Sequence, residues 1–230
     1  MEDDRVRMEA RGGVRLLTLN RPEKLNAADL SMQRALVERW KCIQTDNQAR
    51  AVVVTGAGRA FCAGGDLSLV DALAAGNDTL QKELSLIHRQ LLSAMLETDL
   101  PVIAAVKGAA VGFGAELLAL CDIVIMAEGA FLSDPHVKYG LPPSPACQLV
   151  WPYLTSVAVA KELLMSGRRV DAGEALRLGL VNRITPRGEE LNVAMRMAEE
   201  LAGLPVSGLG AVKRAFNRPV VEQFRRDQSD

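Results

Sequence analysis

Short apolar blocks alternate with longer amphipathic blocks along the chain. The short blocks are apolar on both faces, which is typical of strands buried within a sheet. We predict such strands at residues 14–20, 51–56, 101–106 and 122–127. Apolar residues recur at helical spacing in the longer blocks, which predict helices at residues 28–44, 77–99, 144–154 and 156–167. This alternation predicts an α/β fold with a largely parallel sheet that helices cover on both sides.

The same pattern predicts a mostly helical chain after residue 185, ending in a polar tail at residues 220–230. Asp29 stands directly before the first predicted helix, where its carboxylate is expected to cap the helix. The chain contains no short-period repeat and no low-complexity linker. We therefore expect one compact domain with a helical C-terminal part.

Charge and cysteine content narrow the classes of function. The 27 lysines and arginines nearly balance the 28 aspartates and glutamates, so no overall field favours nucleic acid or an anionic membrane. The charged N-terminus does not resemble a signal peptide and no segment is apolar enough to span a membrane, so a cytoplasmic location is expected. The four cysteines are widely spaced and the chain has two histidines, which predicts small buried side chains rather than disulfides or a metal site.

Two glycine-rich segments each follow a predicted strand and enter a helix. They are GAGRAFCAGGDLS at 56–68 and VKGAAVGFGAELLALCD at 106–122. Parallel sheets bind ligands beyond the carboxyl ends of their strands, and bare N–H groups at a helix start attract negative charge. Neither segment has the G-K-[ST] of a P-loop, and GFGAEL lacks the third glycine of a dinucleotide fingerprint. The glycines are expected to let a ligand approach the backbone closely.

Four blocks in this order resemble the enoyl-CoA hydratase/isomerase (crotonase) superfamily. The blocks are LNRPEKLNA, VVVTGAGRAFCAGGDL, VKGAAVGFGAELLALCDIVIMAE and GRRVDAGEALRLGLVNRI. The resemblance implies an α/β spiral of repeated strand–strand–helix units and a homotrimer or dimer of trimers. It implies a crotonase core over residues 1–185 and a helical region over 186–230 that is shorter than in relatives. It also implies an acyl-coenzyme A thioester as the ligand.

The resemblance assigns roles to several backbone and side-chain groups. The N–H groups of Gly65 and Phe113 correspond to the pair that binds the thioester oxygen in the family, although relatives often have glycine where this chain has Phe113. Glu116 corresponds to the first catalytic glutamate of family hydratases and is the expected general acid and base. Without the family motif, a glutamate in a first helical turn is more often a solvated or helix-capping residue.

The second hydratase glutamate is replaced by His136 in this chain. Its imidazole is expected either to act as an auxiliary acid or base opposite Glu116, or to line the pocket without taking part in chemistry. Asp134 is a weaker candidate, expected to bond the loop backbone. The other histidine, His88, falls within an apolar helix face and is expected to be structural.

Coenzyme A is expected to lie along two loops and to bond mainly to backbone. The residues implied are Lys24, Leu25, Ala27, Ala63, Gly65, Asp66, Leu67, Ser68 and Gly112. No separate cofactor is expected, because coenzyme A is part of the substrate. The predicted activity is that of an enoyl-CoA hydratase. The alternatives are a double-bond isomerase, which needs one base, and a binding protein without turnover, which the missing glutamate would favour.

Overall fold

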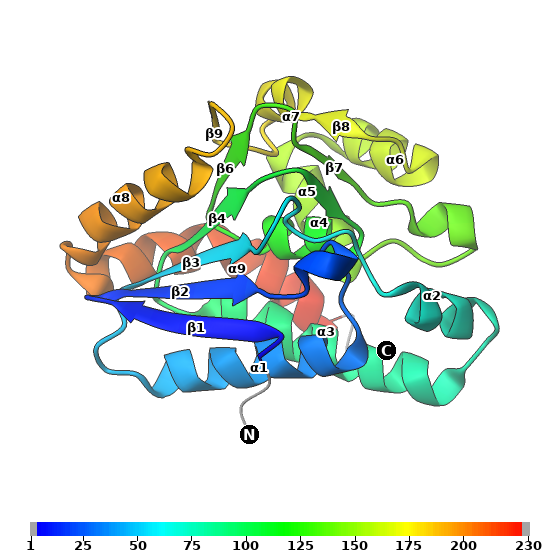
Figure 1. Cartoon of the computed structure of the whole chain (residues 1–230), viewed down its shortest axis with the longest axis horizontal. Coiled ribbons are helices and arrows are strands. Elements are labelled where there is room, and N and C mark those ends of the chain that lie inside the picture. The colour runs from blue at the N-terminus through cyan, green and yellow to red at the C-terminus, as the bar shows by residue number, and fades with distance from the viewer. Residues whose placement is uncertain (1–3, 227–230) are drawn as a thin grey trace.

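The computed structural model describes residues 4–226 (Figure 1). The strands are β1 (Val6–Arg11), β2 (Val14–Leu19), β3 (Ala51–Gly56), β4 (Val102–Val106), β5 (Ala109–Val111), β6 (Ile123–Ala127), β7 (Phe131–Ser133), β8 (Val170–Asp171) and β9 (Arg183–Thr185). The α-helices are α1 (Leu30–Thr45), α2 (Leu67–Ala74), α3 (Asp78–Glu97), α4 (Phe113–Ala119), α5 (Pro145–Leu154), α6 (Val157–Ser166), α7 (Ala172–Leu178), α8 (Glu190–Ala202) and α9 (Val206–Arg226). Short 3-10 helices η1 (Pro22–Lys24) and η2 (His136–Tyr139) complete the list. No helix in this part of the chain is long and apolar enough to cross a membrane.

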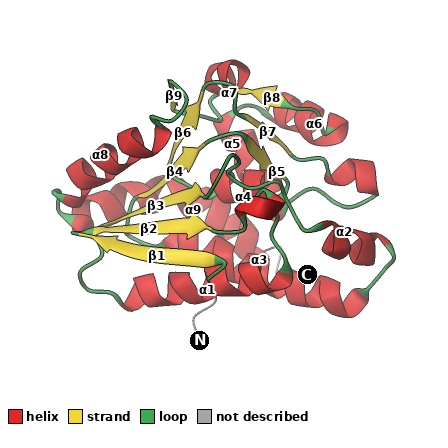
Figure 2. Cartoon of the chain, viewed as in Figure 1, coloured by secondary structure: helices red, strands yellow, loops and turns green. Residues whose placement is uncertain are grey.

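The main sheet has six strands in the order β1-β2-β3-β4-β6-β9. The pairs from β2 to β9 are parallel, and β1 joins β2 antiparallel at the edge. Every residue of β3 and β4 is buried, as the continuous apolar pattern predicts for central parallel strands. Figure 2 shows the strands of this sheet side by side with helices around them. The predicted largely parallel sheet is therefore confirmed.

Alternate residues of each strand pack into two separate apolar clusters. On one face Val53 and Ile103 contact α8 through Ala194 and Ala198. On the other face Val52 and its neighbours contact α1, α3 and α4 in the larger cluster, which includes Trp40, Leu91 and Met95. The period-two alternation of the strands therefore supports helices on both faces of the sheet, as predicted.

Helices α1, α3, α5 and α6 begin close to the predicted positions. The Asp29 side chain accepts a hydrogen bond from the Met32 N–H, which confirms the predicted cap of α1. Asn77 caps α3 in the same way through the Leu80 N–H. The prediction of a polar tail at residues 220–230 is wrong for residues 220–226, which form the final turns of α9. Val220 and Phe224 recur at i and i+4 and are both buried; residues 227–230 lie outside the described part.

The cysteine prediction holds for two of the four side chains. Cys62 and Cys147 are buried, and burial raises the pKa of the Cys62 thiol to about 12. Cys42 is exposed on the outer face of α1 and Cys121 is partly exposed, so these two were wrongly expected to be buried. Helical spacing explains the difference, because Cys42 falls between the buried positions Trp40 and Ile43 of α1.

Candidate active site

The glycines of the two glycine-rich segments bring these segments against each other. A Cβ built on Gly108 would lie 2.2 Å from the Arg59 carbonyl oxygen, and one built on Gly114 would lie 2.6 Å from the Cys62 carbonyl oxygen. The Val111 N–H donates to the same Cys62 oxygen at 2.9 Å. Gly108 and Gly114 are therefore explained by packing between the two loops, and not by the close approach of a ligand that the sequence suggested.

This packing places Gly65 and Phe113 in adjoining loops. The Cα atom of Gly64 lies 3.8 Å from a Cβ built on Gly112, and Gly65 and Phe113 are the next residues of each loop. Gly112 adopts φ 50°, which directs the chain into α4 and favours glycine. Among residues 4–226, neither the Gly65 N–H nor the Phe113 N–H donates a hydrogen bond to a protein acceptor. Two unbonded amides thus lie in adjoining loops, and that of Phe113 is at the start of α4.

A cavity of about 80 Å³ opens beside these loops. Its walls bring together five predicted residues, Ala63, Gly65, Leu67, Gly112 and His136, with Gly64, Val70, Val111, Pro135 and Tyr139. The imidazole Cε1 of His136 lies 3.4 Å from a Cβ built on Gly112, so the ring lies against the start of α4. Phe113 and Glu116 are not on these walls. The structure therefore places His136 on the cavity wall, whereas Glu116 does not line the cavity.

Asp134 holds His136 in place. The Oδ1 atom of Asp134 contacts the imidazole Nδ1, and its Oδ2 accepts a 2.8 Å hydrogen bond from the Ser144 N–H. Burial raises the pKa of Asp134, but the His136 ring and the surrounding amides outweigh it, so the pKa lies below its usual value. The expected backbone bonds of Asp134 are thus present, and the side-chain contact with His136 was not foreseen.

Glu116 lies in the first turn of α4 and its residue is 2% exposed. Its Oε2 atom is 3.2 Å from Nδ1 of His88 on α3. The separation is that of an ion pair, although the angle does not meet hydrogen-bond geometry and Oε2 has no other partner among the described residues. His88 was expected to be structural. A titratable side chain within the apolar face of α3, between the buried residues Leu84 and Leu91, was the signal that it has a polar partner.

The two segments expected to bind coenzyme A lie side by side. The Ala28 N–H donates to Gly64 O at 2.8 Å, the Asp66 N–H donates to Ala28 O at 3.0 Å, and the Ala63 N–H donates to Leu25 O at 3.0 Å. Lys24, Ala27 and Ser68 complete these segments, with Ser68 bonded to Asp66 at the start of α2. The structure thus joins residues 24–28 to residues 63–68.

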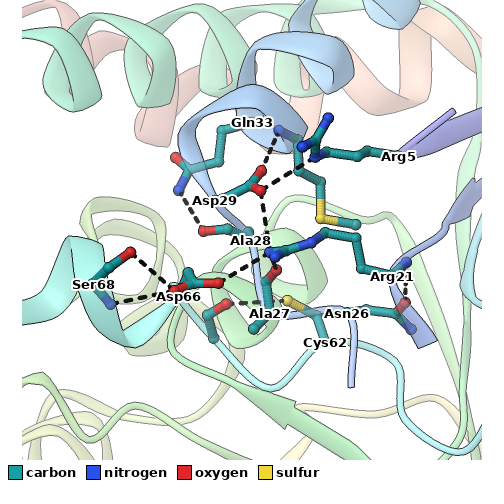
Figure 3. Close-up of polar contacts among 12 residues, drawn as sticks. Arg5, Arg21, Asn26, Ala27, Ala28, Asp29, Gln33, Cys62, Asp66 and Ser68 are labelled. Atoms are coloured by element: carbon teal, nitrogen blue, oxygen red, sulfur yellow. Dashed lines mark hydrogen bonds and ion pairs between the residues drawn. The ribbon is translucent and has the colours of Figure 1, made fainter. Parts of the chain in front are cut away.

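Arg21 and Asn26 hold this junction, and the sequence reasoning gave them no role. The Arg21 guanidinium donates to Ala27 O and contacts the carboxylates of Asp29 and Asp66 at 3.4 and 3.2 Å (Figure 3). Asn26 is fully buried and donates to the carbonyls of residues 57, 60 and 61. Polar residues in a motif between a strand and a helix were the available signal, because buried side-chain amides in loops usually bond the backbone.

A larger cavity of about 400 Å³ lies elsewhere, beneath α9. Val212, Phe216 and Val220 line one side, and Asp122 and Lys213 form an ion pair at 2.7 Å on its wall. None of the predicted site residues line this cavity. Cavity volume alone would therefore not identify the loops that carry the unbonded amides and the buried carboxylate.

A model of the enoyl-CoA hydratase/isomerase family matches residues 9–229 of this chain. The chain belongs to this family. It is 31% identical to the short-chain-enoyl-CoA hydratase of Clostridium acetobutylicum over 219 residues, which are 95% of this chain and 83% of the relative. The family resemblance drawn from the four sequence blocks is thereby confirmed.

Solved structures of the family share the fold. The crystal structure of an enoyl-CoA hydratase/isomerase from Mycobacterium paratuberculosis has a TM-score of 0.88 and 37% identity, covering 96% of this chain and 88% of that one. A monofunctional enoyl CoA isomerase from M. smegmatis has a TM-score of 0.79 and 31% identity, covering 95% of this chain and 94% of that one. The predicted crotonase fold is confirmed. A protein named as a hydratase and one named as an isomerase are thus similar to this chain at the same sequence identity.

Proposed function

We propose that this protein is an acyl-coenzyme A enzyme that acts as an enoyl-CoA hydratase, adding water across the double bond of a 2-enoyl thioester. The observation that carries the proposal is the pair of unbonded amides, Gly65 and Phe113, in adjoining loops. A thioester oxygen gains negative charge as the enolate forms, and two such donors stabilise it without reorganisation. The names of the similar hydratase and hydratase/isomerase support the same class of substrate.

In the proposed reaction the Glu116 carboxylate and the His136 imidazole share the proton transfers. Glu116 exchanges a proton with the acyl carbon or the water, and His136 orients or activates the water from the cavity wall. The hydroxyl of water bonds to the β carbon and a proton to the α carbon. Asp134 keeps the Nδ1 of His136 occupied, which leaves Nε2 for the substrate side.

Isomerisation of the double bond is the second candidate. The similarity to the M. smegmatis isomerase and the absence of a second glutamate favour it, because one base is enough to move a proton along the acyl chain. A protein that binds acyl-CoA without turnover is the third candidate, favoured by the same absence.

A panel of 2-enoyl and 3-enoyl thioesters of coenzyme A separates these candidates. We expect the purified protein to add one water to 2-enoyl thioesters. Mass spectrometry should then show a product heavier than the substrate by one water molecule. Unchanged mass with a shifted double bond would identify an isomerase instead. No product from any thioester, together with tight binding, would identify a binding protein.

The described cavity must widen for an acyl-CoA to enter. Its volume of about 80 Å³ is well below the roughly 300–1,000 Å³ of ordinary small-molecule sites. One wall is the start of α2, a helix that buries none of its residues and exposes 67% of Leu67. Such an element costs little to displace. We propose that α2 moves outward to admit the thioester, which brings Glu116 within reach of the acyl group.

Acetoacetyl-CoA, a stable enolisable thioester, provides a direct measurement of binding. We expect it to raise the melting temperature in proportion to the logarithm of its concentration above Kd. Amide hydrogen exchange should change at residues 63–74, which contain the Gly65 amide and α2, while β3 serves as the internal control. A saturating ligand with neither a thermal shift nor a change in exchange would refute the acyl-CoA proposal.

A homotrimer or a dimer of trimers in the cytoplasm remains our proposal for assembly and location. The outer surface of α9 supports an oligomer, because Phe216 is 80% exposed and Val212 is 60% exposed beside the cavity beneath this helix. Exposed apolar patches of this kind are typical of contact surfaces.

A further inference from the structure

Both ring nitrogens of His88 face buried polar groups from two different helices. Its Nδ1 is 3.2 Å from Glu116 Oε2 on α4, and its Nε2 is 3.2 Å from Gln33 Oε1 on α1. The Phe113 ring packs against the imidazole with centroids 5.6 Å apart. Gln33 and Glu116 are 3% and 2% exposed, so water does not take the place of these partners.

The orientation of the Gln33 amide determines whether the His88 Nε2 carries a proton. The Gln33 Nε2 donates to the Ala28 carbonyl at 3.3 Å, a contact that Figure 3 shows. Because this amide nitrogen is used as a donor, the oxygen Oε1 faces His88, and the His88 Nε2 must donate to it. The Nδ1 faces a carboxylate oxygen, which accepts hydrogen bonds. Opposite an ionised carboxylate, a ring that also donates to Gln33 carries a proton on each nitrogen and is an imidazolium.

The charges around Glu116 also indicate that His88 is positively charged. His88 is the only cationic group within ion-pair distance of Glu116 among residues 4–226. On the side of α5 lies Cys147, whose buried thiol has a pKa well above its usual value and stays neutral, and Asp134 contributes a further negative charge there. A buried carboxylate without a cation is strongly disfavoured. The available counter-charge for Glu116 is thus His88.

We propose that His88 is a positioning residue that carries a positive charge against Glu116 and orients its carboxylate for proton transfer. The inference rests on the proposed function of Glu116 as the acid and base, and it adds Gln33 as the group that fixes the His88 ring. Burial lowers the pKa of His88, but the charge and contact of Glu116 outweigh it and the pKa lies above 6.5.

The two histidines of the chain make a direct measurement possible without substrate. In histidine-detected NMR titrations the protein should give two imidazole signals, His88 and His136, which His136→Ala distinguishes. We expect His88 in the wild type to titrate above 6.5 and to show both N–H groups below its pKa. In Glu116→Gln the counter-charge is gone while burial remains, so the pKa of His88 should fall below 6.5. Equal titration of His88 in both proteins would overturn the inference.

Turnover gives a second, independent test. His88→Gln should lower kcat by roughly tenfold to a hundredfold with little change in KM, less than removal of the base itself. Wild-type activity should decline as pH rises through the His88 pKa, and this decline should be absent in His88→Gln. The double variant His88→Gln/Glu116→Gln should match Glu116→Gln alone, because the two residues act as one unit. Gln90→Ala, exposed on the same helix, is the matched control and should behave as the wild type.

The outcomes separate this inference from the proposed function. A wild type without turnover counts against the hydratase proposal and leaves the NMR titration to decide on the ion pair. Turnover in the wild type with an unchanged kcat and pH profile in folded His88→Gln overturns the positioning role. If His88→Gln does not fold, Gln33→Leu removes the acceptor of Nε2 and should lower the His88 pKa, and an unchanged pKa there also overturns it.

Discussion

Replacing Glu116 with glutamine is expected to lower kcat by 10²–10⁴-fold, the range typical of a lost general acid or base. Glutamine has nearly the shape of glutamate but does not accept a proton. The residue is 2% exposed within α4, so a side chain of the same size keeps the buried position. Acetoacetyl-CoA should bind with nearly unchanged Kd. Steady-state kinetics and calorimetry on the same preparation provide the two measurements.

Glu128→Gln is the control for this experiment, because Glu128 is exposed in the turn after β6 and belongs to neither cavity. It should have wild-type kcat. A loss of less than about tenfold in Glu116→Gln would be too small for a general base. Glu116 would then be a buried residue of the first turn of α4, and the chemistry would depend on His136.

Variants at His136 are expected to give the second-largest effect. His136→Ala should lower hydration by about 10²-fold, because the imidazole lines the cavity beside Gly112 and has its Nδ1 fixed by Asp134. His136→Asn keeps a donor toward Asp134 but transfers no proton at neutral pH. If acid–base chemistry is the role, asparagine should be as slow as alanine. An asparagine variant as fast as the wild type would reduce His136 to a spacer.

A glutamate at this position separates the classes of function. His136→Glu would place a second carboxylate next to buried Asp134, where the two charges repel. The informative protein is therefore His136→Glu/Asp134→Asn, which should hydrate faster than His136→Ala. For an isomerase that uses Glu116 alone, His136→Ala should be nearly silent. A protein that only binds would show no turnover in any variant, with altered affinity for the thioester.

The sequence predicted the parts of this site that depend on local pattern. The strands around β3 and β4, the Asp29 cap and the position of Glu116 in the first turn of α4 all follow from residues close together in the chain. The edge strand β1 was missed because its residues are mostly exposed and alternate with charges, so no apolar run marks it.

The contacts between distant segments were not predictable from one sequence. His88 and Glu116 are 28 positions apart and meet only because α3 and α4 pack on the same side of the sheet. The pattern of α3 shows that His88 is on its apolar face, but not which side chain opposes it. The same holds for Gly114, whose need for a missing Cβ depends on the Cys62 carbonyl of another loop. Side-chain pairing across elements is set by tertiary packing, which periodicity does not specify.

The contact between Gly114 and Cys62 also bears on the order of events in folding. The amides of Gly65 and Phe113 become neighbours only after β3 and β4 have paired and the crossover through α2 and α3 has closed. Closing such a loop costs conformational entropy before favourable contacts form, so sites built from distant segments form late. During refolding, helix content should therefore return before the ability to bind a thioester. A destabilised variant would lose ligand binding by local opening of this junction while most of its helices remain folded.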